Sequence, residues 1–145
     1  MKANELMTGD LVQVKDCIDQ SYYFDEYEPG EIVQVREILD NGINPNWAGA
    51  EVSSILGLED IQPIPITPEI LEKNFGVVER SSDGYSCVIN RELLLAFHLE
   101  ATLDIWIAQP SDWPHLTYSL PLPRYVHELQ HALRLCGIKK EISLC

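Results

Sequence analysis

Three prolines in the middle of the chain constrain its fold more than any other sequence feature. Pro63 and Pro65 lie in the stretch QPIPITPE, and a helix cannot pass through them, because proline lacks an N–H donor and clashes with the preceding turn. Pro68 follows Thr67, and this pair is typical of a helix start, since Thr caps the helix and proline fits its first position. The stretch therefore predicts an extended connector leading into a short helix, with a boundary near residue 66.

The part before this boundary has the pattern of a small β-structure. In GDLVQVKD, Val12 and Val14 fall on one face of a half-buried strand, and EIVQVREILD at 31–40 predicts a second strand. Asn41-Gly42 predicts a tight turn, because both residues tolerate positive φ. Short strands and turns at this spacing predict a small barrel or strongly curved sheet over residues 1–66.

The part after the boundary, residues 67–145, alternates strand-like runs with turns and ends in a helix at 123–136, closed by Gly137. The run IKKEISL suggests a final short strand. The predicted fold class is α+β, with an N-terminal SH3-like small β-barrel followed by an antiparallel sheet covered by a C-terminal helix. The two parts are expected to be subdomains of one small protein.

Bulk composition limits the class of protein. The chain has 145 residues, 46% of them hydrophobic and 23% charged, which suits one globular domain or two very small ones. No apolar run approaches the roughly 20 residues that span a membrane, and the start lacks the apolar stretch of a signal peptide. A cytoplasmic protein is therefore expected. The scattered cysteines are then interpreted as free thiols, mostly small core residues: Cys17, Cys87, Cys136 and Cys145.

Charge is unevenly distributed along the chain. The net charge is −13, and residues 1–66 hold 3 of the 10 cations but 13 of the 23 carboxylates, a net charge of −10. Such a surface repels phosphate backbones, so nucleic acid is not an expected partner. The charge serves either solubility or the docking of a basic protein partner.

The residues RYVHELQHAL contain the His-Glu-x-x-His spacing of zinc hydrolases, in His127, Glu128 and His131. On a helix, an apolar stripe through Val126, Leu129 and Leu133 faces the core, and both histidines lie about 160° from Leu129. They are therefore expected to face solvent, whereas a catalytic zinc needs histidines in a walled cleft and a third ligand.

We therefore predict no metal site, no cofactor and no catalytic residue, with His127 and His131 as the only metal candidates. The alternative is a metal-dependent hydrolase that uses His127, Glu128 and His131. His98 is expected to be a strand histidine with a hydrogen-bond partner. Glu100 and Asp104 are expected to be solvated strand-end charges rather than a catalytic carboxylate pair.

One acidic stretch combines carboxylates with aromatic rings, and tyrosine is enriched at protein interfaces. It is either an interaction loop for a basic partner or a set of rings that fold back onto the barrel. The residues are Tyr22, Tyr23, Phe24, Asp25, Glu26 and Tyr27.

Three blocks of the chain resemble a family of short bacterial and phage proteins. They are GDLVQV near the start, LEDIQPIPITPEILEKN in the middle and YVHELQHALRLCGI near the end, in the order in which the family has them. The family's helix after the prolines tends to end in Asn-Gly-Phe, whereas this chain has Asn74, Phe75 and Gly76. The resemblance implies this order of elements and a cytoplasmic location, and it carries no catalytic residue over. The function we favour is that of a non-enzymatic interaction or accessory protein of phage or mobile-element origin.

Overall fold

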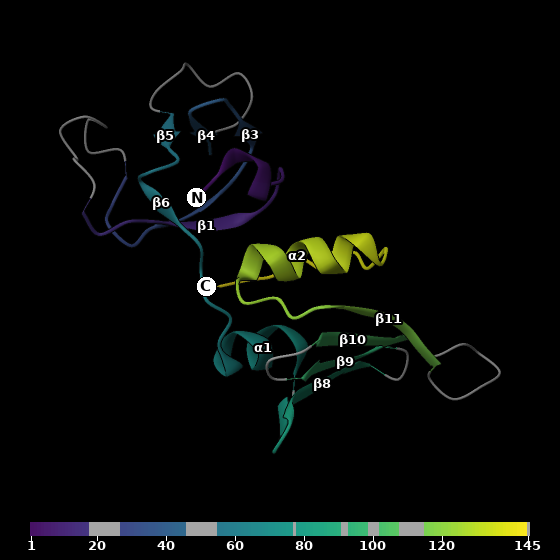
Figure 1. Cartoon of the computed structure of the whole chain (residues 1–145). Helices are drawn as coiled ribbons and strands as arrows, with labels where there is room; N and C mark the ends of the chain where they lie inside the picture. The colour runs from purple at the N-terminus through teal and green to yellow at the C-terminus, as the bar shows by residue number, and fades with distance from the viewer. Residues whose placement is uncertain are drawn as a thin grey trace. The chain divides into compact units, whose positions relative to one another are not determined.

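Among the residues that the computed structural model describes, there are two α-helices and eleven strands in three antiparallel sheets, so the α+β class is confirmed. Figure 1 shows the arrangement of these elements. The structure describes residues 1–17, 27–45, 55–76, 78–90, 93–98, 102–107 and 115–144. The first part contains the 3₁₀ turn η1 (Ala3–Glu5) and strands β1 (Leu11–Val14), β2 (Ile32–Gln34), β3 (Glu37–Ile38), β4 (Gly42–Asn44), β5 (Leu56–Gly57) and β6 (Ile61–Gln62). The second contains α1 (Pro68–Phe75), β7 (Val78–Ser81), β8 (Gly84–Asn90), β9 (Leu93–His98), β10 (Thr102–Ile107), β11 (His115–Pro121) and α2 (Val126–Leu135).

The chain forms two compact units. Unit 1 is Met1–Pro65 together with Tyr125–His127, and unit 2 is Ile66–Arg124 together with Glu128–Cys145. The first residues of α2 thus belong to unit 1 and the rest of the helix to unit 2. The division into subdomains at 1–66 and 67–145 stays a prediction.

Unit 1 contains two small sheets around a shared core. β1 lies between β2 and β6, and β4 lies between β3 and β5. Val12 and Val14 of β1 are both fully buried while their neighbours are not, which confirms the alternation predicted for this strand. Residues from both sheets contribute to one hydrophobic cluster: Leu6, Val12, Val14, Tyr27, Val33, Val35, Ile43, Leu56 and Ile61.

The second predicted strand of this unit is divided in two. Residues 31–40 form β2 and β3, which belong to different sheets. The predicted turn at Asn41-Gly42 does join β3 to β4, but Gly42 is not among the glycines with positive φ. Glycine suits this position for another reason, which is the close approach of β5. A Cβ at residue 42 would lie only 2.4 Å from the carbonyl oxygen of Leu56.

Unit 2 is built on a five-stranded sheet with the strands in the order β11-β10-β9-β8-β7. α1 precedes the sheet and begins as the sequence predicts, since Oγ1 of Thr67 accepts a hydrogen bond from the N–H of Ile70. The helix ends at Gly76, whose φ of +84° suits a residue without a side chain. Buried residues alternate along the central strands, with Leu95 and Phe97 in β9 and two more in β10, Leu103 and Ile105.

The expected strand at 138–144 does not form. The side chain of Asn74 in α1 holds this segment instead: its Nδ2 donates to the carbonyl of Ser143 at 2.8 Å, and its Oδ1 accepts from the N–H of Ser143 at 2.7 Å. Nδ2 also lies 2.8 Å from the carbonyl oxygen of Ile70. A side-chain amide thus takes the place that a neighbouring strand would have, because it offers the same donor and acceptor pair.

α2 begins at Val126 rather than near Pro123. The residues before it are extended and pair with the proline-rich connector: the N–H of Ile66 donates to the carbonyl of Arg124, and the N–H of Val126 donates to the carbonyl of Ile64. A bridge between Pro65 and Tyr125 lies between these two bonds. Backbone already used in this pairing cannot form a helical turn.

The cysteine thiols differ in burial, and this gives a testable order of reactivity. Burial raises the pKa of Cys87 to about 11 and raises that of Cys136 as well, while Cys17 is exposed. Because the thiolate is the reactive form, a thiol reagent at pH 8 should modify Cys17 first, Cys136 more slowly and Cys87 only when the chain unfolds. Peptide mapping by mass spectrometry measures the order; native-state modification of Cys87 as fast as Cys17 would contradict the burial.

Two leucines of α2, one inside the apolar stripe and one outside it, allow a matched stability test. Leu129 is fully buried, whereas Leu135 in the same helix is 75% exposed. Leu129→Ala should lower the free energy of unfolding by about 2–5 kcal/mol, through lost transfer energy and a cavity. Leu135→Ala makes the same chemical change and should stay within about 0.5 kcal/mol. Urea melts of both variants measure the difference, and equal losses would mean that the helix face is misassigned.

Candidate functional site

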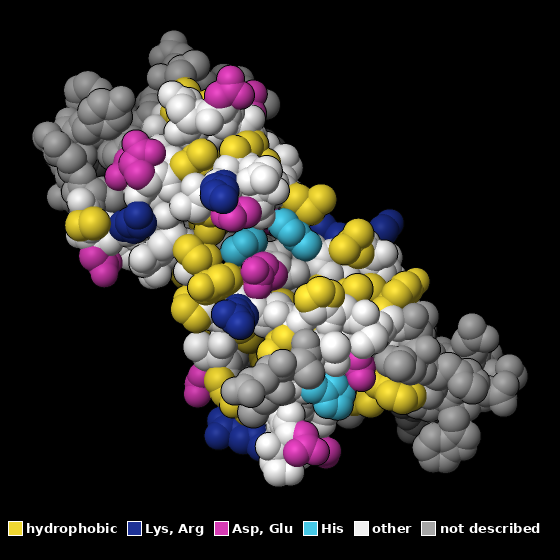
Figure 2. Space-filling model, in the orientation of Figure 1, with side chains coloured by type: hydrophobic (Ala, Val, Ile, Leu, Met, Phe, Trp, Pro, Cys, Tyr) yellow, Lys and Arg dark blue, Asp and Glu magenta, His cyan; other side chains and the backbone are white. Residues whose placement is uncertain are grey.

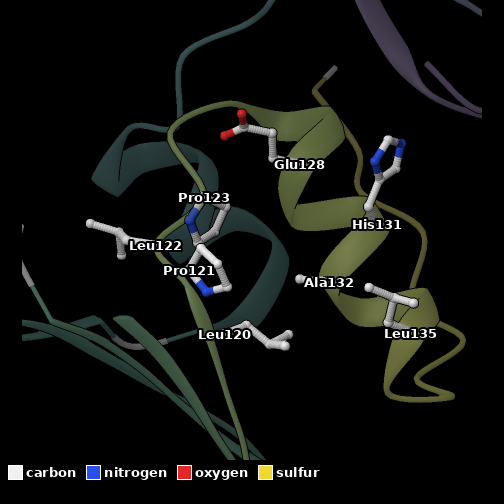
Figure 3. A pocket seen from close by; sticks show the side chains of 8 residues that line it. All are labelled: Leu120, Pro121, Leu122, Pro123, Glu128, His131, Ala132 and Leu135. Atoms are coloured by element: carbon white, nitrogen blue, oxygen red, sulfur yellow. The ribbon is translucent and has the colours of Figure 1, made fainter. Parts of the chain in front are cut away.

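A groove in unit 2, called here the α2 groove, lies between α2 and the segment that leads into it (Figure 3). Its volume is about 270 Å³. The segment lines one side and the helix lines the other: Leu120, Pro121, Leu122, Pro123, Glu128, His131, Ala132 and Leu135. On the face shown in Figure 2, hydrophobic side chains gather over α2 and β11.

The lining of the α2 groove is mostly apolar, with Glu128 and His131 as its charged or titratable side chains. Glu128 lies in the first turn of α2, where a carboxylate complements the helix dipole, and its Oε2 accepts a hydrogen bond from the N–H of Arg124 at 2.7 Å. His131 is half-buried, one turn further along. The arrangement suits an apolar ligand with a single charged or hydrogen-bonding group.

His127 corrects the expectation that both motif histidines face solvent. Its side chain is only 5% exposed, and its ring stacks on Tyr125 with centroids 5.9 Å apart and planes within 10°. His127 is absent from the groove lining, whereas Glu128 and His131 belong to it. The apolar stripe predicted an exposed His127, because the prediction assumed that the whole helix buries one and the same face. The first residues of α2 instead belong to unit 1.

The motif therefore divides between two environments. Within the described ranges, no three His, Cys, Asp or Glu side chains come together in a group that could hold a metal ion. Glu128 is engaged by the backbone N–H of Arg124, as expected of a carboxylate that stabilises a helix start.

A second polar cluster lies on the sheet of unit 2. Nε2 of His98 in β9 lies 3.1 Å from Oδ2 of Asp104 in β10, and Oγ of Ser119 in β11 donates to Oδ1 of Asp104 at 2.7 Å. The prediction that His98 has a partner is confirmed. Ser119 binds the carboxylate rather than the imidazole, so the histidine is not placed to take a proton from this hydroxyl, as a nucleophile would require. Glu100 lies outside the described residues.

The predicted interaction residues are only partly covered by the structure. Tyr27 is buried in the core of unit 1, so its ring packs inside the unit, as the alternative to an interaction loop proposes. The others lie outside the described residues: Tyr22, Tyr23, Phe24, Asp25 and Glu26.

Sequence reasoning missed most of the α2 groove. The signal was Leu135, which lies about 120° from Leu129 on a helical projection and so falls outside the apolar stripe. A large apolar residue on the polar side of a helix is unremarkable alone. It becomes informative only when the structure places Leu120 and Pro121 across from it.

Comparison of the chain with protein-family models, with curated proteins and with solved structures gives no match. Among the described helices, none is both long and apolar enough to cross a membrane.

The placement of the motif predicts the response to zinc. Purified without an affinity tag and dialysed, the chain should hold well under one zinc ion per molecule, because no three potential ligands come together among the described residues. A chelator should leave the melting temperature unchanged, since a built metal site would contribute folding free energy. Metal analysis and thermal melts test this; one tightly held zinc per chain that His131→Ala removes would support the hydrolase alternative.

Proposed function

We propose that this chain is a non-enzymatic interaction protein that binds a partner in the α2 groove. The observation that carries the proposal is an apolar groove whose helical rim contains Leu135, 75% exposed. Apolar surface left open beside a concave site favours burial against a ligand, because each Å² removed from water contributes about 25 cal/mol. One side of the groove is helix α2, and the other side is the end of β11 with the residues that follow it, which suits a preformed binding site.

The chemistry of the lining favours binding over catalysis. A catalytic site needs a nucleophile or base, a group that orients it and donors for the developing charge. In the α2 groove, the carboxylate of Glu128 already accepts a backbone hydrogen bond, and the remaining lining apart from His131 is Leu, Pro and Ala. These side chains supply shape and apolar contact, which are the features of a docking site.

Finer features of the proposal come from the sequence. We infer that unit 1 is a barrel of the SH3 type, supported by its two small sheets around one core. The chain is proposed to act in the cytoplasm as an accessory protein of a phage or mobile element, on the strength of the family resemblance. Its partner is basic and is not a nucleic acid, because the chain carries a net charge of −13. The segment Tyr22–Glu26 is proposed as a second contact.

A pair of adjacent substitutions tests the docking site. Leu135 and Arg134 are neighbouring exposed residues of α2, but only Leu135 lines the groove. In extracts of the host, Leu135→Gln should capture much less of the partner than the unmodified chain does, because a polar amide replaces apolar contact. Arg134→Gln should capture a similar amount. Capture should also weaken as salt is raised, if the partner is basic.

Quantitative mass spectrometry of the captured proteins gives the readout, with melting temperatures as the control for folding. If the three chains capture the same proteins in the same amounts, the α2 groove is not the docking site.

A further inference from the structure

The sheet of unit 2 has two edges of different character. β7, at one edge, has four residues and includes exposed Glu79 and Arg80. Short, charged edges resist pairing with other chains. β11, at the other edge, has seven residues, HLTYSLP, with no Asp, Glu, Lys or Arg among them. Charged side chains therefore protect the edge at β7, whereas β11 has none and is interrupted only by a bulge between its pairs with Ile105 and Trp106 and by Pro121 at its end.

β11 pairs with β10 alone in the part of the chain that the structure describes. In an antiparallel strand, alternate residues direct their N–H and C=O groups toward one neighbour or the other. A strand with one neighbour therefore offers every second backbone pair to the outside. Such groups are matched best by another extended segment, which supplies donors and acceptors at the same spacing.

The α2 groove adjoins this edge. Leu120 of β11 lies opposite Leu103 of β10, which is fully buried, so Leu120 is directed to the covered face of the sheet. Leu120 is only half-buried and lines the groove, with Ala132 and Leu135 of α2 on the other side (Figure 3). Leu120 therefore belongs both to the covered face of the sheet and to the lining of the α2 groove, so the groove lies directly beside the β11 edge.

We propose that the α2 groove binds an extended segment of a partner protein, which adds to β11 as a sixth strand. This rests on the proposed function and names its binding mode. The segment forms backbone hydrogen bonds with the outer edge of β11 and directs every second side chain into the groove. Those side chains are apolar and of moderate size, because they contact Leu120, Ala132 and Leu135.

Charge selects the residues that flank the segment. Glu128 is the carboxylate of the groove lining, and the whole chain carries a net charge of −13. A Lys or Arg at the end of the added strand therefore meets a favourable field and a carboxylate, whereas an acidic segment is repelled. The same net charge opposes a second copy of this chain as the occupant, since two such molecules repel each other at long range.

A random library of twelve-residue peptides, selected on the full chain, tests the segment's chemistry. Enriched peptides should carry apolar residues at every second position together with more Lys and Arg than the starting library. Their binding should be lost in Leu135→Gln and kept in Arg134→Gln. A library in which no enriched peptide depends on Leu135 would overturn both this inference and the proposed function.

Proline substitutions test the strand itself. Of Tyr118 and Ser119, one directs its N–H to β10 and the other directs it outward. Because the Ser119 hydroxyl is bound to Asp104, the melting temperature of Ser119→Pro is compared with that of Ser119→Ala, and that of Tyr118→Pro with Tyr118→Ala. The proline variant that loses less against its alanine control is the outward one, because proline is tolerated where no ladder bond is lost. That variant should bind the selected peptide about tenfold more weakly or worse, as expected for the loss of one or two net hydrogen bonds.

Hydrogen exchange supplies a readout specific to strand addition. Peptide binding should slow the exchange of the outward amide among Tyr118, Ser119 and Leu120. The selected peptides could instead have apolar residues at helical spacing, bind without protecting this amide, and bind the folded proline variant equally well. That result would overturn strand addition and leave the α2 groove as a docking site. A homodimer in sedimentation equilibrium that the same proline variant dissociates would make a second copy the occupant, and would also overturn the proposal.

Discussion

Backbone pairing between the proline-rich connector and the residues before α2 fixes where this helix begins. The N–H of Val126 is bound to the carbonyl of Ile64, so one of the donors that a helix start leaves open is satisfied by the connector. The connector can do this because Pro63 and Pro65 keep it extended. The helix consequently begins at Val126, later than the predicted start at residue 123.

This starting point decides the environment of each residue in the motif. His127 lies in the first turn, is buried in unit 1 and stacks on the ring of Tyr125, while Glu128 and His131 line the α2 groove of unit 2. A zinc hydrolase helix presents both of its histidines to one cleft. Here neighbours along the same helix belong to different units, and a sequence motif defined only by spacing carries no information about that division.

The sequence predicted the features that depend on local chemistry. The alternation in β1, the capping of α1 by Thr67 and the buried side of α2 at Leu129 all result from the pattern of nearby residues. The sequence did not predict the features that depend on contacts between segments far apart in the chain. The role of Asn74 in holding the C-terminal segment depends on a contact across 69 positions of sequence, and nothing near Asn74 reveals it. The α2 groove was missed for the same reason, because Leu120 and Leu135 are brought together only by the turn into the helix.

The charge of the chain and the open edge of β11 are physically connected. A strand of seven residues without Asp, Glu, Lys or Arg, which pairs on one side only among the described residues, favours self-association, and proteins ordinarily oppose this with charges on the edge itself. In this chain the net charge of −13 can oppose it from a distance, since long-range repulsion between copies does not require a charge on β11. Such repulsion depends on the sign of the charge on the approaching molecule. A lysine on the edge, by contrast, would hinder the pairing of any strand with β11. In the proposed binding mode, an acidic protein with a neutral edge attracts a basic extended segment and repels its own copies, and raising the salt concentration should weaken both effects together.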